Sequence, residues 1–199
     1  MKFEKVGIIG GGAMGAGIAH VCAAAGMQVT LKDVSQELAD KGVKSARDVF
    51  DRRLAKGTLT AEAAEGGKAL LSGTTSYDGL GEADLVIEAV IEKMPVKKAV
   101  FAELDRVTPA HCILASNTSA LSITEMGRST GRADKVGGLH FFNPAPVMKL
   151  VEAIRGEGTS DATTEALLGF CKAIGKTPVL INRDTAGFLV NRLLLIYFN

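Results

Sequence analysis

The stretch Val6-Gly7-Ile8-Ile9-Gly10-Gly11-Gly12-Ala13-Met14-Gly15-Ala16-Gly17 decides the fold. Its apolar start, Val6 to Ile9, is typical of a short buried parallel strand. The glycines and the small residues after them predict a tight turn and then a helix to Ala25, with Gly26 in the position that ends helices. Gln28 to Leu31 predicts a second strand, and Asp33 follows it. The segment therefore predicts a strand–turn–helix–strand unit.

The same stretch also looks like a signal peptide or a membrane span. No Asp, Glu, Lys or Arg lies between Lys5 and Lys32, and Gly7, Gly11 and Gly15 repeat the small-residue spacing of membrane helices. However, six glycines between Gly7 and Gly17 leave it weakly hydrophobic for its length. We therefore favour the strand–helix interpretation.

Gly10, Gly12 and Gly15 together with Asp33 form a dinucleotide-binding fingerprint, because they follow a strand, open a helix and precede an acidic residue after the next strand. Gly10 permits the turn, Gly12 admits the pyrophosphate to the backbone, and Gly15 brings helix and strand together. Asp33 would accept hydrogen bonds from the adenosine ribose and repel a 2′-phosphate. The prediction is NAD rather than NADP, against the alternative of a glycine-rich turn without a ligand.

Composition excludes several classes of protein. The 199 residues include 23 basic and 22 acidic ones, for a net charge of +1, which argues against nucleic-acid binding. The 47% of hydrophobic residues predicts an ordered globular chain. Three cysteines far apart indicate neither a disulfide framework nor a zinc site, and we expect them in the core of a protein from a reducing compartment.

Strand and helix patterns alternate along the rest of the chain. Helical patterns run from Ser35 to about Lys56, from Thr60, from Pro95 to Val107, at a Ser122-x-x-Glu125 capping box, and from Asp161 to Ile174. Strand patterns occupy Thr74–Tyr77, Leu85–Val90, Cys112–Ala115, Val136–Phe141, Leu150–Ile154 and Val179–Ile181. The fold class is therefore α/β, with a doubly wound, Rossmann-type sheet.

The carboxyl-terminal stretch Phe188 to Phe198 is apolar except for Asn191 and Arg192. A helix that is apolar almost all round must be buried. We therefore expect the chain to be part of a larger protein, or the helix to contact a partner.

His140 differs from the other two histidines. His20, within a helix, and His111, on a loop, are expected to be structural or exposed. His140 ends a strand before a turn with two prolines, and antiparallel pairing of the flanking strands about Pro146 would place it opposite Glu152. A carboxylate there fixes the imidazole tautomer and stabilises the imidazolium, which suits a general base. The spacing alone also allows a chance pair on the surface.

Five segments together resemble the L-3-hydroxyacyl-CoA dehydrogenase family, in family order and from the first strand to the last residue. They are Gly10-Gly-Gly-Ala-Met-Gly-Ala-Gly, Val86-Ile-Glu-Ala-Val-Ile-Glu, Ser116-Asn-Thr-Ser, Gly138-Leu-His-Phe-Phe-Asn-Pro-Ala-Pro-Val-Met-Lys-Leu-Val-Glu and Gly187-Phe-Leu-Val-Asn-Arg-Leu-Leu.

The resemblance implies a mechanism. His140 would take the proton of the substrate's 3-hydroxyl while a hydride leaves the same carbon for the nicotinamide, and Glu152 would orient His140. Ser119 and Asn191 match residues that hydrogen-bond the reacting oxygens. Without the resemblance, Ser119 would be taken to cap a turn and Asn191 to interrupt an apolar helix.

The resemblance also implies the ligand contacts. Ala13, Met14 and Ala89 would contact the cofactor, and Glu92, Lys97, Asn117 and Asn143 would line its nicotinamide-ribose end. The family uses the helical insertion, here residues 35–71, against coenzyme A, and Lys56 matches its phosphate-contacting lysine. Otherwise, Glu92 and Lys97 would be read as surface charges.

The resemblance further implies two domains, an NAD-binding domain over 1–184 and the start of a helical dimerisation domain over 185–199. We expect a full-length homodimer, no membrane or nucleic-acid partner, and NAD binding by this piece even if it is inactive alone. Ala186 replaces the usual proline before Gly187, which should loosen the start of the last helix. The absence of a targeting signal indicates the cytoplasm, although a removed presequence would leave no trace.

Two alternatives stay open. The first is another β-hydroxyacid dehydrogenase on the same nucleotide fold, but those enzymes use a catalytic lysine and no comparable signature is evident. The second is a non-catalytic NAD-binding or scaffold module.

Overall fold

The computed structural model describes residues 2–197 and contains one eight-stranded sheet in the order β3-β2-β1-β4-β5-β6-β7-β8. Strands β1 to β6 are parallel, β7 is antiparallel to β6, and β8 is parallel to β7. The strands are β1 (Lys5–Ile9), β2 (Gln28–Lys32), β3 (Leu71–Thr74), β4 (Leu85–Glu88), β5 (Ile113–Ser116), β6 (Val136–Phe141), β7 (Leu150–Ile154) and β8 (Thr177–Ile181).

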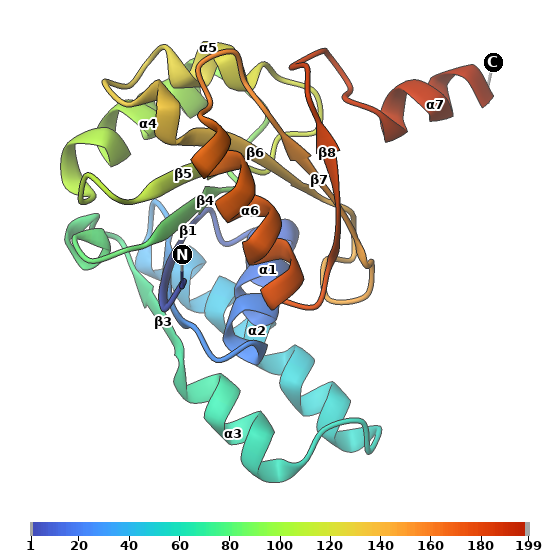
Figure 1. Cartoon of the computed structure of the whole chain (residues 1–199). Helices are drawn as coiled ribbons and strands as arrows, with labels where there is room; N and C mark the ends of the chain where they lie inside the picture. Colours follow the sequence, from blue (N-terminus) through green and yellow to red (C-terminus); the bar gives the residue numbers. More distant parts are fainter. Residues whose placement is uncertain (1, 198–199) are drawn as a thin grey trace.

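Helices cover both faces of this sheet (Figure 1). They are α1 (Ala13–Ala24), α2 (Gln36–Ala55), α3 (Ala61–Ala69), α4 (Met94–Val107), α5 (Ile123–Gly127), α6 (Asp161–Ala173) and α7 (Val190–Tyr197). Neighbouring strand residues point to opposite faces, so Ile8 contributes to the core under α1, α2 and α6, whereas Ile9 contributes to the core under α4 and α5. The doubly wound, Rossmann-type α/β fold is confirmed.

The strand expected over Thr74–Tyr77 is wrong, because the third strand is Leu71–Thr74. Leu71 is buried and lies opposite Val29, which sets the register of this strand. The chain turns after Thr74, whose hydroxyl accepts a hydrogen bond from the amide of Ser76. The β-propensity of the Thr–Tyr segment is thus overridden by side-chain hydrogen bonds that favour a turn.

The capping box expected at Ser122 is half confirmed. The Ser122 hydroxyl accepts a hydrogen bond from the amide of Glu125, as a helix cap should. The Glu125 carboxylate does not return to Ser122 but pairs with Lys98 at 3.3 Å. The side chains of Ser35 and Thr60 cap α2 and α3, at the residues where the helical patterns were expected to start.

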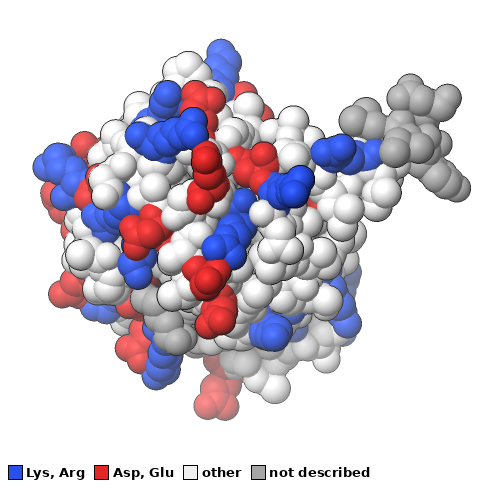
Figure 2. Space-filling model, turned by 45° about the horizontal axis from the view of Figure 1, so that its top comes forward, with Lys and Arg blue, Asp and Glu red and all other residues white. Residues whose placement is uncertain are grey.

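Two parts project from the body in Figure 1, the α2–α3 arm at the bottom and α7 at the right. Leu193 and Leu194 of α7 are exposed, as expected for an apolar helix that would be buried by another part of a larger protein or by a partner. Phe198, the end of the apolar stretch predicted from the sequence, lies outside the described residues. On the face shown in Figure 2, basic and acidic side chains are interspersed.

The three cysteines are buried and free, as expected. Burial raises the pKa of each thiol to about 12. Within the described residues, none of the helices has the length and apolar character that a membrane crossing requires.

His20 is buried in the core between α1 and α2, where its ring lies 4.2 Å from that of Phe50, centroid to centroid. Within the described part of the chain its Nδ1 has no hydrogen-bond partner. Burial, assisted by the positive charge of Arg53, lowers the pKa of His20 from 6.5 to about 4. The folded protein therefore holds this ring neutral where the unfolded chain protonates it.

We expect acid to destabilise the protein through His20. Between pH 6.5 and 4 the unfolded state binds a proton that the folded state does not, so the free energy of unfolding falls as the pH falls. The loss from this group is about 2 kcal/mol at pH 5 relative to pH 7.5. Urea unfolding at both values measures it, and His20→Gln should reduce the pH dependence by that amount. An unchanged pH dependence in His20→Gln would contradict the assignment.

Candidate active site

The glycine loop lies at the carboxyl end of β1, next to the end of β4. Gly10 has a φ of +100°, and a Cβ there would lie 2.7 Å from the carbonyl oxygen of Ala89. A Cβ on Gly15 would lie only 1.8 Å from the Gly10 oxygen, so helix α1 and the loop are in closest contact there. A Cβ on Gly12 would meet nothing within 4 Å. Gly12 therefore leaves open space before the first amides of α1, which is where the fingerprint predicts the pyrophosphate.

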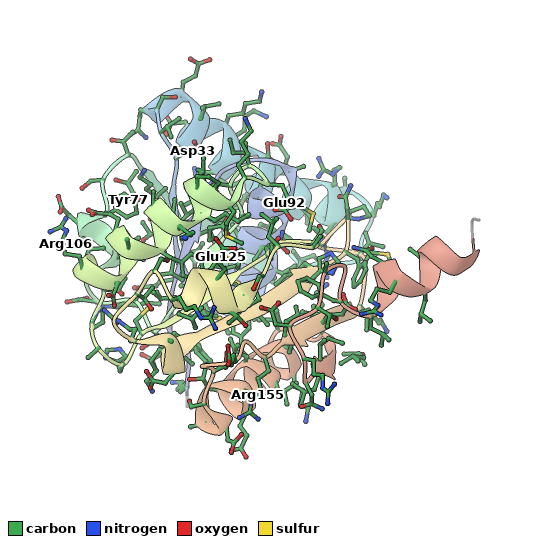
Figure 3. All side chains as sticks on the ribbon, turned by 90° about the horizontal axis from the view of Figure 1, so that it is seen from above. Asp33, Tyr77, Glu92, Arg106, Glu125 and Arg155 are labelled. Carbon is green, nitrogen blue, oxygen red and sulfur yellow. The ribbon has the colours of Figure 1, made fainter. Side chains whose placement is uncertain are left out.

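Asp33 supports this loop from the end of β2. Its Oδ2 accepts a hydrogen bond from the amide of Gly11 at 2.6 Å, and its Oδ1 accepts one from the amide of Val34 at 2.6 Å. In Figure 3, Asp33 and Glu92 both lie in the upper half of the view. The carboxylate is thereby fixed beside the glycine loop, the place from which it would meet an adenosine ribose.

His140 and Glu152 face each other across the antiparallel pair β6–β7, as the sequence predicted. His140 Nδ1 lies 2.7 Å from Glu152 Oε2, and the two side chains are 6% and 0% exposed. A carboxylate at Nδ1 favours the tautomer with hydrogen on Nδ1, which leaves Nε2 free to accept a proton. Phe142 and Phe188 contact the ring, with centroids at 4.5 and 5.8 Å.

Glu152 is ionised although it is buried. Burial alone would raise its pKa, but hydrogen bonds from His140 and from the amides of Val190 and Leu189 outweigh burial and hold the pKa below its usual value. The two amides donate to Glu152 Oε1 at 2.9 and 3.0 Å. The carboxylate therefore binds both the imidazole and the start of α7.

Ser119 and Asn191 are brought together although 72 positions separate them in the sequence. The Asn191 side-chain amide donates to the carbonyl oxygen of Ser119 at 3.1 Å. Ser119 is exposed and directly follows Thr118 after β5, whereas Asn191 lies in the first turn of α7. The segment holding Asn191 also binds Glu152, so both expected oxygen-binding residues lie near the His140–Glu152 pair.

The residues expected around the nicotinamide ribose differ in accessibility. Glu92 is 44% exposed, whereas Lys97 is 1% exposed and binds Glu88 and Glu92. Asn117 Oδ1 accepts a hydrogen bond from the amide of Phe141 at 2.9 Å, which ties β5 to β6 beside His140. Asn143 is exposed and precedes Pro144 through a cis peptide bond.

Sequence reasoning missed three buried polar residues below Glu92, namely Glu88, Ser116 and Thr118. The Ser116 hydroxyl donates to Glu88 Oε2 at 2.6 Å, and the Thr118 hydroxyl donates to Glu92. The available signal was Glu88, a charged residue at the end of an otherwise apolar strand. Charges in fully buried positions are rare unless they are paired.

Lys56 lies apart from these residues, exposed at the carboxyl end of α2 on the projecting arm. That end of the arm and α7 lie at opposite ends of the molecule in Figure 1. Within residues 2–197, no three His, Cys, Asp or Glu side chains are close enough together to hold a metal ion.

Comparison with known proteins gives consistent matches. The profile of the family "3-hydroxyacyl-CoA dehydrogenase, NAD binding domain" matches residues 5–185. The mitochondrial hydroxyacyl-coenzyme A dehydrogenase of Mus musculus is 45% identical over 201 residues, which cover 98% of this chain and 63% of the relative. The 3-hydroxybutyryl-CoA dehydrogenase of Bradyrhizobium diazoefficiens is 42% identical, over 98% of this chain and 67% of the relative.

Solved structures agree. The crystal structure of (S)-3-hydroxybutyryl-CoA dehydrogenase from Ralstonia eutropha superposes with a TM-score of 0.96 at 42% identity, covering all of this chain and 70% of that one. This chain spans 63% of the length of the mouse relative. The expected cofactor, NAD, is confirmed by the family match, which covers the glycine loop and the His140–Glu152 pair. The chain belongs to the family of 3-hydroxyacyl-CoA dehydrogenase NAD-binding domains.

Proposed function

We propose that this protein catalyses the reversible oxidation of L-3-hydroxyacyl-CoA to 3-ketoacyl-CoA, with NAD as the hydride acceptor. The observation that carries the proposal is the 2.7 Å contact between His140 Nδ1 and the ionised Glu152. A buried imidazole with its tautomer fixed is suited to general-base chemistry. The names of the relatives support the same activity.

In the proposed mechanism, His140 Nε2 accepts the proton of the substrate's 3-hydroxyl. The Glu152 carboxylate holds the Nδ1 hydrogen and stabilises the imidazolium that forms. Bound NAD supplies the acceptor for the hydride that leaves the same carbon. The Ser119 hydroxyl and the Asn191 amide orient the substrate oxygens, where charge changes during the reaction. In the reverse direction His140 returns the proton to the oxygen.

The cofactor preference follows from Asp33. Both of its oxygens already accept backbone hydrogen bonds, which fixes the carboxylate at the ribose end of the predicted cofactor site. A carboxylate there accepts hydrogen bonds from ribose hydroxyls and repels a 2′-phosphate. We therefore propose NAD binding with much weaker binding of NADP.

The remaining expectations stay predictions. Lys56 and the α2–α3 arm would contact the coenzyme A part of the substrate, and the full-length protein would be a homodimer. The division at residues 184 and 185 and the cytoplasmic location also stay predictions, since the relatives include mitochondrial enzymes.

Two measurements test the proposal. Titration calorimetry of this chain should show binding of NAD and, at equal concentration, little binding of NADP. The full-length protein mixed with acetoacetyl-CoA and NADH should oxidise the NADH, followed by absorbance. A folded chain that binds no NAD would overturn the cofactor assignment. A protein that binds NAD but does not oxidise NADH would be a non-catalytic module.

A further inference from the structure

A buried set of charges lies under the exposed Glu92, at the carboxyl ends of β4 and β5. Glu88, the last residue of β4, is fully buried, and both its oxygens are occupied. Oε1 accepts from Lys97 Nζ at 2.7 Å and from the amide of Val90 at 2.7 Å. Oε2 accepts from the Ser116 hydroxyl at 2.6 Å. Glu88 is therefore fixed at once by the segment that follows β4, by α4 and by β5.

Lys97 connects this buried carboxylate to the surface. Its ammonium contacts Glu88 Oε1 and, at 3.2 Å, Glu92 Oε2. Lys97 is 1% exposed, so the ammonium lies below Glu92 and presents almost no surface of its own. A cofactor that approaches from solvent would meet Glu92 first, and Lys97 would act mainly through it.

Glu92 is held in one arrangement. Its Oε1 accepts hydrogen bonds from the Thr118 hydroxyl and from the amide of Ser119, the latter at 2.9 Å. Partial burial alone would raise the pKa of Glu92, but Thr118, the charge of Lys97 and the Ser119 amide hold it below its usual value. An ionised carboxylate is therefore fixed between the ends of β4 and β5.

The place of this set in the sheet links it to the cofactor crevice. Strand β1, which leads into the glycine loop, pairs with β2 on one side and β4 on the other, with Ile9 opposite Glu88. The connection from β3 to β4 carries the chain from one half of the sheet to the other, so the direction of the strand order reverses at the neighbouring strands β1 and β4. Open α/β sheets bind ligands at such a point. The carbonyl oxygen of Ala89, the residue after Glu88, would lie 2.7 Å from a Cβ on Gly10, so this segment packs against the glycine loop.

A purely stabilising role explains this set poorly. Burying an ion pair costs so much hydration that well-packed apolar residues in its place are often equally stable or better. What a buried pair of this kind does provide is a fixed geometry. We propose that Glu88 and Ser116 are positioning residues, which hold Lys97 so that Glu92 is fixed in the orientation that binds the ribose next to the nicotinamide. This inference rests on the proposed function.

The test is NAD affinity in variants of this chain, measured by calorimetry beside thermal unfolding. Glu88→Gln keeps the shape but removes the charge that holds Lys97, and we expect the Kd for NAD to rise about 10-fold, the lower end of what lost supporting contacts cost at metal sites. Ser116→Ala should shift the Kd in the same direction by less. Lys98→Met is the matched control, because Lys98 lies on the same helix but pairs with exposed Glu125. It should bind NAD as the wild type does.

The double variant Glu88→Gln/Lys97→Met separates positioning from stability. It removes both buried charges, so the melting temperature should recover relative to Glu88→Gln while the affinity for NAD stays low. Carboxyl NMR should show the pKa of Glu92 rising in this variant towards its usual value. The double variant also serves as the test if Glu88→Gln alone does not fold.

Two results would overturn the inference, an unchanged Kd in Glu88→Gln or a Kd that recovers with the melting temperature in the double variant. Failure of the proposed function looks different, because the wild-type chain itself would then bind no NAD.

Discussion

The variant His140→Gln of the full-length protein is expected to lose most of its turnover. Glutamine keeps a polar side chain on β6 but cannot accept the substrate proton, and removal of a general base costs about 10²- to 10⁴-fold. The reduction of acetoacetyl-CoA by NADH, followed at saturating concentrations, measures the loss in kcat. The affinity for NAD should not change, since the substitution alters none of the residues predicted to contact the cofactor.

His111→Gln is the matched control for this experiment. His111 is exposed on the loop before β5 and lies 3.5 Å from Asp84, away from the residues of the site. Its replacement should leave kcat unchanged. A His140→Gln protein that turns over at the wild-type rate would remove His140 from the mechanism and leave the cofactor assignment intact.

Serine in place of Gly15 is expected to lower the stability of the protein, whereas serine in place of Gly12 is expected to lower its affinity for NAD. At Gly15 a Cβ would lie 1.8 Å from the Gly10 carbonyl oxygen, so the loop and α1 must separate. Overpacking of this kind costs about 1–3 kcal/mol or more of stability. At Gly12 the Cβ meets nothing, and φ of −63° suits any residue, so Gly12→Ser should fold normally, with serine as a favourable helix cap.

The affinity for NAD distinguishes the two positions further. In Gly12→Ser the new side chain occupies the space before the α1 amides, and a clash of about 1–3 kcal/mol there weakens NAD about 10- to 100-fold. Urea unfolding and calorimetry on the same samples give both quantities. A stable Gly12→Ser protein with wild-type affinity would show that the pyrophosphate does not bind at this loop.

The sequence was sufficient for the parts of the site that local chemistry determines. The pairing of His140 with Glu152 was predictable because β6 and β7 are neighbours in the chain, joined by residues 142–149, and antiparallel pairing about the middle of that connection places the two residues opposite each other. The glycine loop was predictable because the requirements for positive φ at Gly10 and for close approach at Gly15 act within six residues. The third strand was wrong, where hydrogen bonds to Thr74 and Ser76 outweigh β-propensity, and half of the capping box at Ser122 was wrong, because Glu125 pairs with Lys98.

The buried contacts of Glu88 were not predictable in the same way. Ser116 is 28 residues away and meets Glu88 through the parallel pairing of β4 and β5, whose register is set by the packing of the intervening helix and by no turn. The burial of Lys97 depends on the same packing of α4 against the sheet. The sequence pattern of α4 alone suggests a charge on the surface. His20 is similar, since only the position of α2 decides that its ring contacts Phe50.

Glu152 connects the proton-accepting imidazole to helix α7. Its Oε2 contacts the imidazole and its Oε1 holds two backbone amides at the start of α7. A swing of α7 about this point must either break both amide contacts or drag the carboxylate, and the ring with it, out of line. A contact that fixes the position of α7 therefore also fixes the orientation of the His140 ring. A displacement of this projecting helix would change the position of Nε2, the nitrogen that accepts the proton in the proposed mechanism.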